Sequence, residues 1–285
     1  MINVIKTSGW PFSYDTSQYH TFKPSKFEWH HGDCDYSDVT VYFDLDHMGG
    51  FNNNGSGLKF LLGGFEKNKD RLKFLWLSES RAITGKVYNH VLENADLFFG
   101  SYDAIFVHDR EIIETDKRFT YLPNGSNKHW ITDCGIHKKT KLVSMINSGK
   151  RMCAGHLVRN KIMSKFKDKV DLFGLIYNPI ERKETGLNDY MFSIALENAQ
   201  YKTYITEKIL DCFVTGTIPI YLGAPDIGDY FNEEGIIKFT DNFDIEQLNE
   251  DLYYSKMGAI NDNFDRCMNM ISSDDLLYEE VCKSL

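Results

Sequence analysis

The sequence predicts an α/β protein with two doubly wound domains, each built on a parallel sheet. Its 285 residues suit two domains of roughly 130 to 150 residues. Short apolar runs alternate with amphipathic segments along most of the chain, and one loop-rich stretch at 123–140 interrupts this alternation. A content of 42% hydrophobic and 26% charged residues is that of a globular protein, which excludes a disordered or fibrous chain.

In the first half, buried strands closed by polar residues are predicted at VTVYFDL (39–45), LKFLWLS (72–78) and AIFVHD (104–109). Residues 87–100 have helical spacing between two of these strands, and Gly100 is the expected helix end. Because strands and helices alternate, the strands are expected to pair in parallel.

The alternation resumes after residue 140. Strands are predicted at 142–146, 170–176, 190–196, 218–222 and 236–239, and helices at about 154–167, about 207–215 and, in the acidic tail, from about 244 onward. We therefore expect an N-terminal domain at 1–140, a C-terminal domain at 141–265, and a helical segment at 266–285 that packs back on the N-terminal domain.

Charge and cysteine usage narrow the class of protein. A net charge of -9 argues against a nucleic-acid partner, which would need clustered Lys and Arg. The six cysteines include no C-x-x-C pair, so no zinc or redox motif is indicated, and they are expected to be free thiols. The first residues, MINVIKTSGW, do not resemble a signal peptide, and no apolar run reaches the roughly 18 residues of a transmembrane segment. We expect a cytoplasmic protein.

The segment at 192–225 carries the most chemistry. It is predicted to be a buried strand, a polar loop, a helix and a second buried strand, which places the loop at the carboxyl edge of the sheet, where ligands bind. Thr206 suits the N-cap of the helix, and Glu207 and Lys208 occupy its first turn. An ammonium and helix N–H groups suit a diphosphate, and a carboxylate suits a ribose diol. Alternatively, Glu207 is only a favourable first-turn acid and Lys208 a solvated charge.

Three motifs in this segment, FSIALEN (192–198), YITEK (204–208) and TIPIYLGAP (217–225), together closely resemble the signature of glycosyltransferase family 10, the α-1,3-fucosyltransferases. The resemblance implies a GT-B fold, with two Rossmann-like domains and an interdomain cleft, and inverting transfer of fucose from GDP-fucose. It implies that Glu207 holds the ribose and Lys208 the phosphates, with Asn198 and Tyr204 against the phosphate and sugar. The sequence departs from the family at Ala195 and Leu196, where Cys and Phe are more usual.

The resemblance extends to two further positions. Arg159 takes the place of the family's arginine in the helix after the first C-terminal strand, where a guanidinium suits a diphosphate leaving group. Lys150, Arg151 and His156 are weaker candidates, more simply interpreted as solvated loop charges. Glu79, just after a buried strand, matches the family's catalytic glutamate, which would take the proton from the acceptor hydroxyl. Arg81 replaces the family's usual proline and is a potential partner for Glu79.

Several alternatives stay open at the level of sequence. D-x-D patterns at 33–35 and 44–46 are also compatible with a metal-dependent transferase, but such patterns are frequent in a chain with 41 acidic residues. We therefore expect no required cofactor and no metal site. The donor is expected to be GDP-fucose and the acceptor a glycan hydroxyl. Another nucleotide-sugar donor, or a non-catalytic relative that binds nucleotide or carbohydrate, is also compatible with the motifs.

Overall fold

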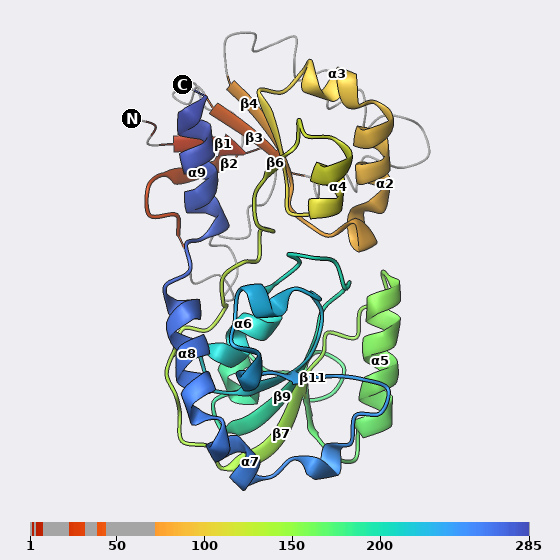
Figure 1. The fold of residues 1–285 in the computed structure, drawn as a ribbon, viewed down its shortest axis with the longest axis vertical. Helices are drawn as coiled ribbons and strands as arrows, with labels where there is room; N and C mark the ends of the chain where they lie inside the picture. The colour runs from red at the N-terminus through yellow and green to blue at the C-terminus, as the bar shows by residue number, and fades with distance from the viewer. Residues whose placement is uncertain (1, 3, 8–22, 32–38, 44–71, 285) are drawn as a thin grey trace. The chain divides into compact units, whose positions relative to one another are not determined.

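The computed structural model describes residues 2, 4–7, 23–31, 39–43 and 72–284. The chain divides into two compact units (Figure 1). Unit 1 contains the described residues up to Gly125 together with the C-terminal segment from Ile271, and unit 2 contains Ser126–Met270. Within the described ranges, no helix combines the length and apolarity that a membrane crossing requires.

Unit 1 is built on a parallel sheet in the order β2-β1-β3-β4-β5-β6. Its strands are β1 (Val4–Thr7), β2 (Glu28–His31), β3 (Val39–Phe43), β4 (Leu72–Leu77), β5 (Ala104–Val107) and β6 (Thr120–Tyr121). Three strands coincide with the predicted apolar runs, which confirms the parallel α/β assignment. Strands β1 and β2 were not predicted because they are short and lack a continuous apolar pattern.

The helices of unit 1 cover both faces of this sheet. Helices α2 (Arg81–Glu93), α3 (Ala95–Phe99) and α4 (Arg110–Thr115) follow β4 and β5. One face of β4, with Leu75 and Leu77, packs against α2 residues Val87 and Val91. Its other face, with Phe74 and Trp76, belongs to a second core cluster. This alternation is what a strand buried on both faces requires.

Helix α9 (Ser273–Lys283), at the C-terminal end of the described chain, completes the second core cluster of unit 1. Leu277 and Val281 are fully buried beside Ile5 of β1, and Figure 1 shows α9 next to β1 and β2. The indole Nε1 of Trp29 donates to Asp274 Oδ1 at 3.0 Å. The end of the sequence therefore stabilises the sheet formed by its beginning.

Unit 2 is built on a second parallel sheet in the order β11-β10-β9-β7-β8. The strands are β7 (Lys141–Ile146), β8 (Asp171–Phe173), β9 (Tyr190–Leu196), β10 (Ile218–Leu222) and β11 (Ile237–Lys238). Helix α5 (Ala154–Phe166) packs on one face and α6 (Glu207–Phe213) on the other (Figure 1). Helices α7 (Glu250–Ser255) and α8 (Met257–Met268) contribute Tyr253 and Cys267 to these cores.

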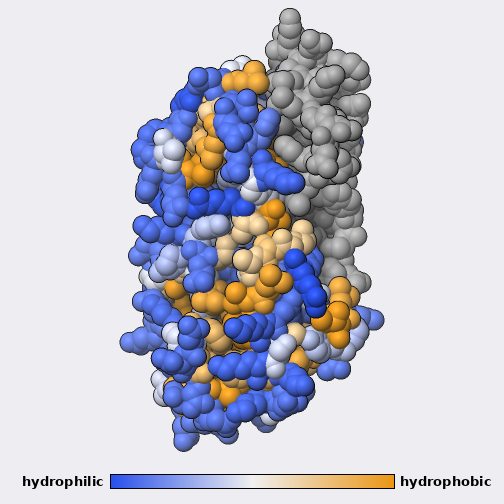
Figure 2. Space-filling view, turned by 90° about the vertical axis from the view of Figure 1, so that its right-hand side faces the viewer, coloured by the Kyte–Doolittle hydropathy of each residue, from blue (hydrophilic) through white to orange (hydrophobic). Residues whose placement is uncertain are grey.

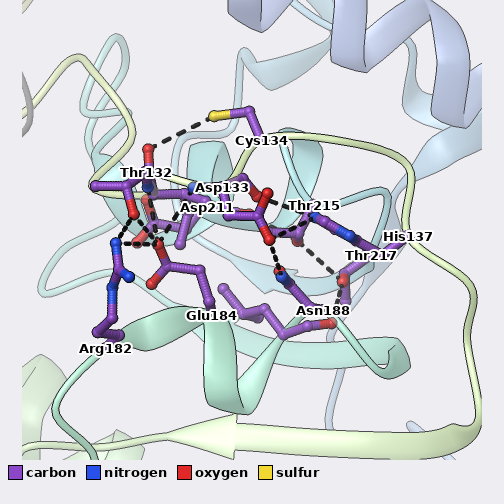
Figure 3. Close-up of polar contacts among 12 residues, drawn as sticks. Thr132, Asp133, Cys134, His137, Arg182, Glu184, Asn188, Asp211, Thr215 and Thr217 are labelled. Atoms are coloured by element: carbon purple, nitrogen blue, oxygen red, sulfur yellow. Dashed lines mark hydrogen bonds and ion pairs between the residues drawn. The ribbon is translucent and has the colours of Figure 1, made fainter.

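The loop at 126–140 belongs to unit 2, so the units divide before the expected boundary at 140. The Lys139 ammonium is buried and donates to the carbonyl oxygens of Leu187, Asn188 and Thr215. Thr132 donates to Glu184 through its backbone N–H and its hydroxyl, at 2.8 and 2.7 Å (Figure 3). These long-range contacts attach the loop to unit 2, and no local sequence signal indicates them.

The helix predicted at 87–100 is also different in the structure. Ser80 begins α2 earlier, because its hydroxyl accepts the backbone N–H of Ala82. Asn94 then separates α2 from α3, with its side-chain amide donating to the carbonyl of His90 at 2.9 Å. Gly100 caps α3 with φ -76°, so it does not use the left-handed conformation expected of a C-terminal glycine.

Candidate functional site

The predicted donor-binding residues lie at the carboxyl ends of β7 and β9, two adjacent strands of unit 2. The chain leaves β7 through α5 toward β8 on one side, whereas β9 pairs with β7 on the other side. Such a reversal of strand order creates a topological switch point, where ligands of open α/β sheets bind. Arg159 comes from α5, and Asn198 directly follows β9.

Arg159, Asn198 and Tyr204 form a chain of polar contacts at this switch point. Arg159 Nη2 donates to Asn198 Oδ1 at 2.6 Å, and Asn198 Nδ2 donates to the Tyr204 hydroxyl at 3.5 Å. Arg159 is only 6% exposed, and its Nε has no hydrogen-bond partner among the described residues. A buried guanidinium with an unused N–H group is suited to bind an anion.

Helix α5 approaches Asn198 so closely that the contact depends on a glycine. A Cβ on Gly155 would lie 2.0 Å from the carbonyl oxygen of Asn198. The neighbouring Cys153 thiol donates to the same oxygen at 3.7 Å. The first turn of α5 therefore positions Arg159 against Asn198.

The loop between β9 and α6 is held in an unusual conformation. Thr203 has φ +64°, which is costly for a β-branched residue, and its N–H donates to both oxygens of Asp226 at 3.0 and 3.1 Å. Beyond it, the buried Glu197 accepts the N–H of Thr206 at 3.0 Å. These two carboxylates set the path of the segment that carries Tyr204.

The first turn of α6 contains the predicted acid and ammonium. Thr206 is its N-cap, as predicted, and accepts the N–H of Lys208 at 3.4 Å. Lys208 Nζ lies 3.5 Å from Glu207 Oε1 and 3.2 Å from Glu197 Oε2. Lys208 is therefore ion-paired and not a solvated charge, and Glu207, at 8% exposed, is buried and not only a favourable first-turn acid.

A second lysine, Lys183, completes this charge cluster. Its Nζ lies 2.6 Å from Asp211 Oδ2, 3.7 Å from Glu207 Oε1 and 4.3 Å from the centre of the Trp130 ring. Burial by itself would raise the pKa of Glu207, but Lys208, Lys183 and then the Thr206 hydrogen bond lower it to about 2. Burial raises the pKa of Asp211 to about 6, with Lys183 acting in the opposite direction. Glu207 is therefore an anion, and hence a hydrogen-bond acceptor, at neutral pH.

Glu79, the predicted catalytic base, belongs to unit 1 and is partly buried at the end of β4. Its Oε1 accepts the N–H of Ser80 at 2.7 Å, and its backbone carbonyl accepts the Tyr88 hydroxyl at 3.1 Å. Arg81 forms ion pairs with Asp109, at 2.8 Å, and with Glu111. The guanidinium that was a potential partner for Glu79 thus binds two other carboxylates.

The sequence indicates only part of this site. Lys183 and Asp211 had no signal, because their contact joins segments far apart in the chain. His156 was interpreted as a solvated loop charge, but it is 3% exposed and lies within α5, so that interpretation is wrong. Glu197 belongs to the FSIALEN motif, which was the signal available for it. Both D-x-D patterns lie outside the described residues.

Apolar side chains surround the switch point. Leu175, Ile176 and Tyr177, after β8, are 76%, 59% and 40% exposed, and Leu157 of α5 is 56% exposed. Figure 2, which faces the side that carries α5, shows hydrophobic groups among the hydrophilic ones there. A Cβ on Gly149 would lie 2.7 Å from Ile176 Cδ1, so the loops after β7 and β8 are in contact.

The segment that carries this site matches a known protein family. Residues 136–261 match the family model described as "Glycosyltransferase family 10 (fucosyltransferase) C-term". This range lies within unit 2 and covers less than half of the chain. It includes the three motifs and Arg159 but not Glu79, and the predicted resemblance to family 10 is confirmed.

Two fucosyltransferases are similar to parts of this chain. The α-(1,3)-fucosyltransferase FucT of Helicobacter pylori is 40% identical over 70 residues, which are 24% of this chain and 14% of that protein. The α-(1,3)-fucosyltransferase B of Drosophila melanogaster is 34% identical over 101 residues, 34% of this chain and 22% of that protein. The matched segments thus span less than a quarter of these relatives.

Solved structures support the two-unit fold. A crystal structure of an α1,3-fucosyltransferase matches this chain with a TM-score of 0.50 and 15% sequence identity. The match covers 99% of this chain and 88% of the chain in that structure. The structure of TarM of S. aureus matches with a TM-score of 0.51 and 13% sequence identity, and this match covers 87% of this chain and 56% of the TarM chain. The predicted GT-B class, with two α/β units on parallel sheets, is confirmed.

Proposed function

We propose that this protein is an inverting fucosyltransferase that moves fucose from GDP-fucose to a hydroxyl group of a carbohydrate acceptor. The proposal is supported by the match of residues 136–261 to the family model and by two groups of contacts in that range among the five residues that the resemblance assigns to the donor. They are Arg159, Asn198, Tyr204, Glu207 and Lys208.

The geometry suggests a role for each donor-binding group. Arg159 and Lys208 offer fixed cations to the diphosphate, which gains negative charge as it leaves. Glu207 is ionised at neutral pH and can accept hydrogen bonds from the two ribose hydroxyl groups. Asn198 and Tyr204, joined by a hydrogen bond, orient the phosphate and the sugar. Because the chain itself supplies these cations, we propose that transfer needs no divalent metal.

Glu79 is our candidate for the general base. In an inverting transfer, one carboxylate takes the proton from the acceptor hydroxyl while that oxygen attacks C1 from the face opposite the diphosphate. The β-linked donor then yields an α-fucoside and GDP, and the proton passes to Glu79.

The first test is GDP release by the purified, folded protein, given GDP-fucose and a panel of glycan acceptors, with and without EDTA. We expect release with at least one acceptor and no effect of EDTA. Thermal shift with GDP-fucose and with other GDP- and UDP-sugars tests the donor, because a ligand at about 100 times its Kd adds about 2.7 kcal/mol of stability. A larger shift with another nucleotide-sugar would reassign the donor.

The second test separates chemistry from binding. Glu79→Ala should lower transfer by about 10²- to 10⁴-fold, because general-base catalysis typically contributes that much. GDP affinity should stay within a few-fold of wild type. Lys208→Ala should weaken GDP binding as well. Glu93→Ala, at an exposed position of unit 1, is the matched control and should leave both properties unchanged. Transfer retained within a few-fold by Glu79→Ala would show that another group is the base.

A further inference from the structure

His156, in the first turn of α5, has its tautomer set by the fold. Its side chain is 3% exposed, and its Nδ1 accepts the backbone N–H of Met152 at 3.1 Å. A neutral imidazole with Nδ1 as acceptor carries its proton on Nε2. No described residue makes a hydrogen bond to that Nε2–H, so it is available as a donor.

Three cations from neighbouring segments act electrostatically on this imidazole. Arg159 lies one turn further along α5, Lys150 precedes the helix, and Lys208 belongs to α6. Burial, followed by the charges of Arg159, Lys150 and Lys208, lowers the pKa of His156 to about 4. His156 is therefore neutral near pH 7, and its Nε2–H is a hydrogen-bond donor.

Helix α5 contains, close to His156 in the sequence, a second hydrogen-bond donor without a partner in the described part of the chain. Gly155, next to His156, packs against the carbonyl of Asn198, and Arg159 donates to the side chain of Asn198. The buried Arg159 Nε has no partner among the described residues. A donor and cations collected at one point suit a ligand with more than one negative charge, whose oxygens can accept from several of them.

We propose that His156 is a further ligand of the donor diphosphate, with its Nε2–H donating to a phosphate oxygen beside Arg159 and Lys208. This inference rests on the proposed function and adds a residue to it. Because Nδ1 already accepts the Met152 N–H, His156 stays neutral when the donor binds and contributes through its Nε2–H alone.

Two substitutions separate this role from a structural one. In His156→Gln the side-chain amide provides an N–H near the position of Nε2, without titrating. In His156→Asn the side-chain oxygen can replace Nδ1 as acceptor for Met152, but nothing replaces the Nε2–H. The affinity of the 285-residue chain for GDP is measured by calorimetry at neutral pH. Melting temperatures show that both variants are folded.

We expect His156→Gln to bind GDP within about threefold of wild type and His156→Asn to bind at least about tenfold more weakly, the range for a hydrogen bond to a charged group. The reverse order, or equal affinity in both variants, overturns the role of His156 and leaves the proposed function standing. If wild type does not bind GDP, both proposals fail.

The neutral state of His156 is tested with GDP-fucose in the absence of acceptor, because its diester phosphates do not titrate near neutrality. Wild type and His156→Gln should show the same pH dependence of affinity between about pH 8 and about pH 5.5, the usual range of histidine. A dependence that is present in wild type and absent from His156→Gln would overturn the role of a neutral His156.

Discussion

Replacement of Lys183 by Met tests the buried charge cluster of unit 2 most directly. Lys183 and Asp211 are 17% and 2% exposed, with their charged atoms 2.6 Å apart, and Glu207 lies 3.7 Å from the same ammonium. At an effective dielectric constant of about 20, the closer pair attracts by about 6 kcal/mol. Part of this attraction is offset by the desolvation of the lysine. Removal of one partner of a buried ion pair typically lowers the free energy of unfolding by about 3 to 5 kcal/mol, and we expect a loss of that size for Lys183→Met.

The loss should depend on pH in a direction set by Asp211. Burial raises the pKa of Asp211 to about 6, so the folded state binds the Asp211 proton more tightly than the unfolded chain does. The stability that this proton contributes is therefore lost as pH rises from about 4 to about 6. Without Lys183, the pKa of Asp211 rises further, and its ionisation penalises the folded state more. The difference between Lys183→Met and wild type should therefore be larger at pH 8 than at pH 5.

Urea unfolding followed by circular dichroism at both pH values measures this difference. Lys169→Met is the matched control, because Lys169 and Glu246 are 2.5 Å apart but 52% and 68% exposed, and it should lower the stability much less than Lys183→Met. The double variant Lys183→Met/Asp211→Asn should recover most of the stability, because it removes both charges. A loss below about 1 kcal/mol for Lys183→Met at pH 8, or no difference between the two pH values, would refute the assignment of a buried, coupled cluster.

Two substitutions test the packing around the site and in unit 1. Gly155→Ala forces α5 away from the Asn198 carbonyl, so we expect weaker GDP binding in calorimetry and a loss of about 1 to 3 kcal/mol in urea unfolding. Gly85→Ala in α2, where a Cβ meets open space, should be neutral or stabilising, and equal effects of the two would contradict the close approach. Leu277→Ala should destabilise unit 1 by about 2 to 5 kcal/mol in urea unfolding, because it empties a fully buried position in α9. Leu276→Ala, at a partly buried position, should cost less, and a smaller loss for Leu277→Ala would show that α9 does not stabilise unit 1.

The sequence by itself determined the elements that local chemistry specifies. Strands β9 and β10 coincide with the predicted 190–196 and 218–222, because both are continuous apolar runs bounded by polar residues and turns. The N-cap at Thr206 was predicted from the preference of a hydroxyl for that position, and the spacing of the motifs indicated the family. These signals act over a few residues and can be read without knowing the rest of the chain.

Only the tertiary structure decided which charges become buried and paired. His156 and Lys183 look like surface charges in sequence, but burial and the partners brought by other segments give one a fixed tautomer and the other a buried partner in Asp211. The boundary before Ser126 and the return of α9 to unit 1 likewise depend on contacts between residues far apart in the chain. Desolvation and Coulomb interactions depend on distance in space, so a local pattern does not encode them.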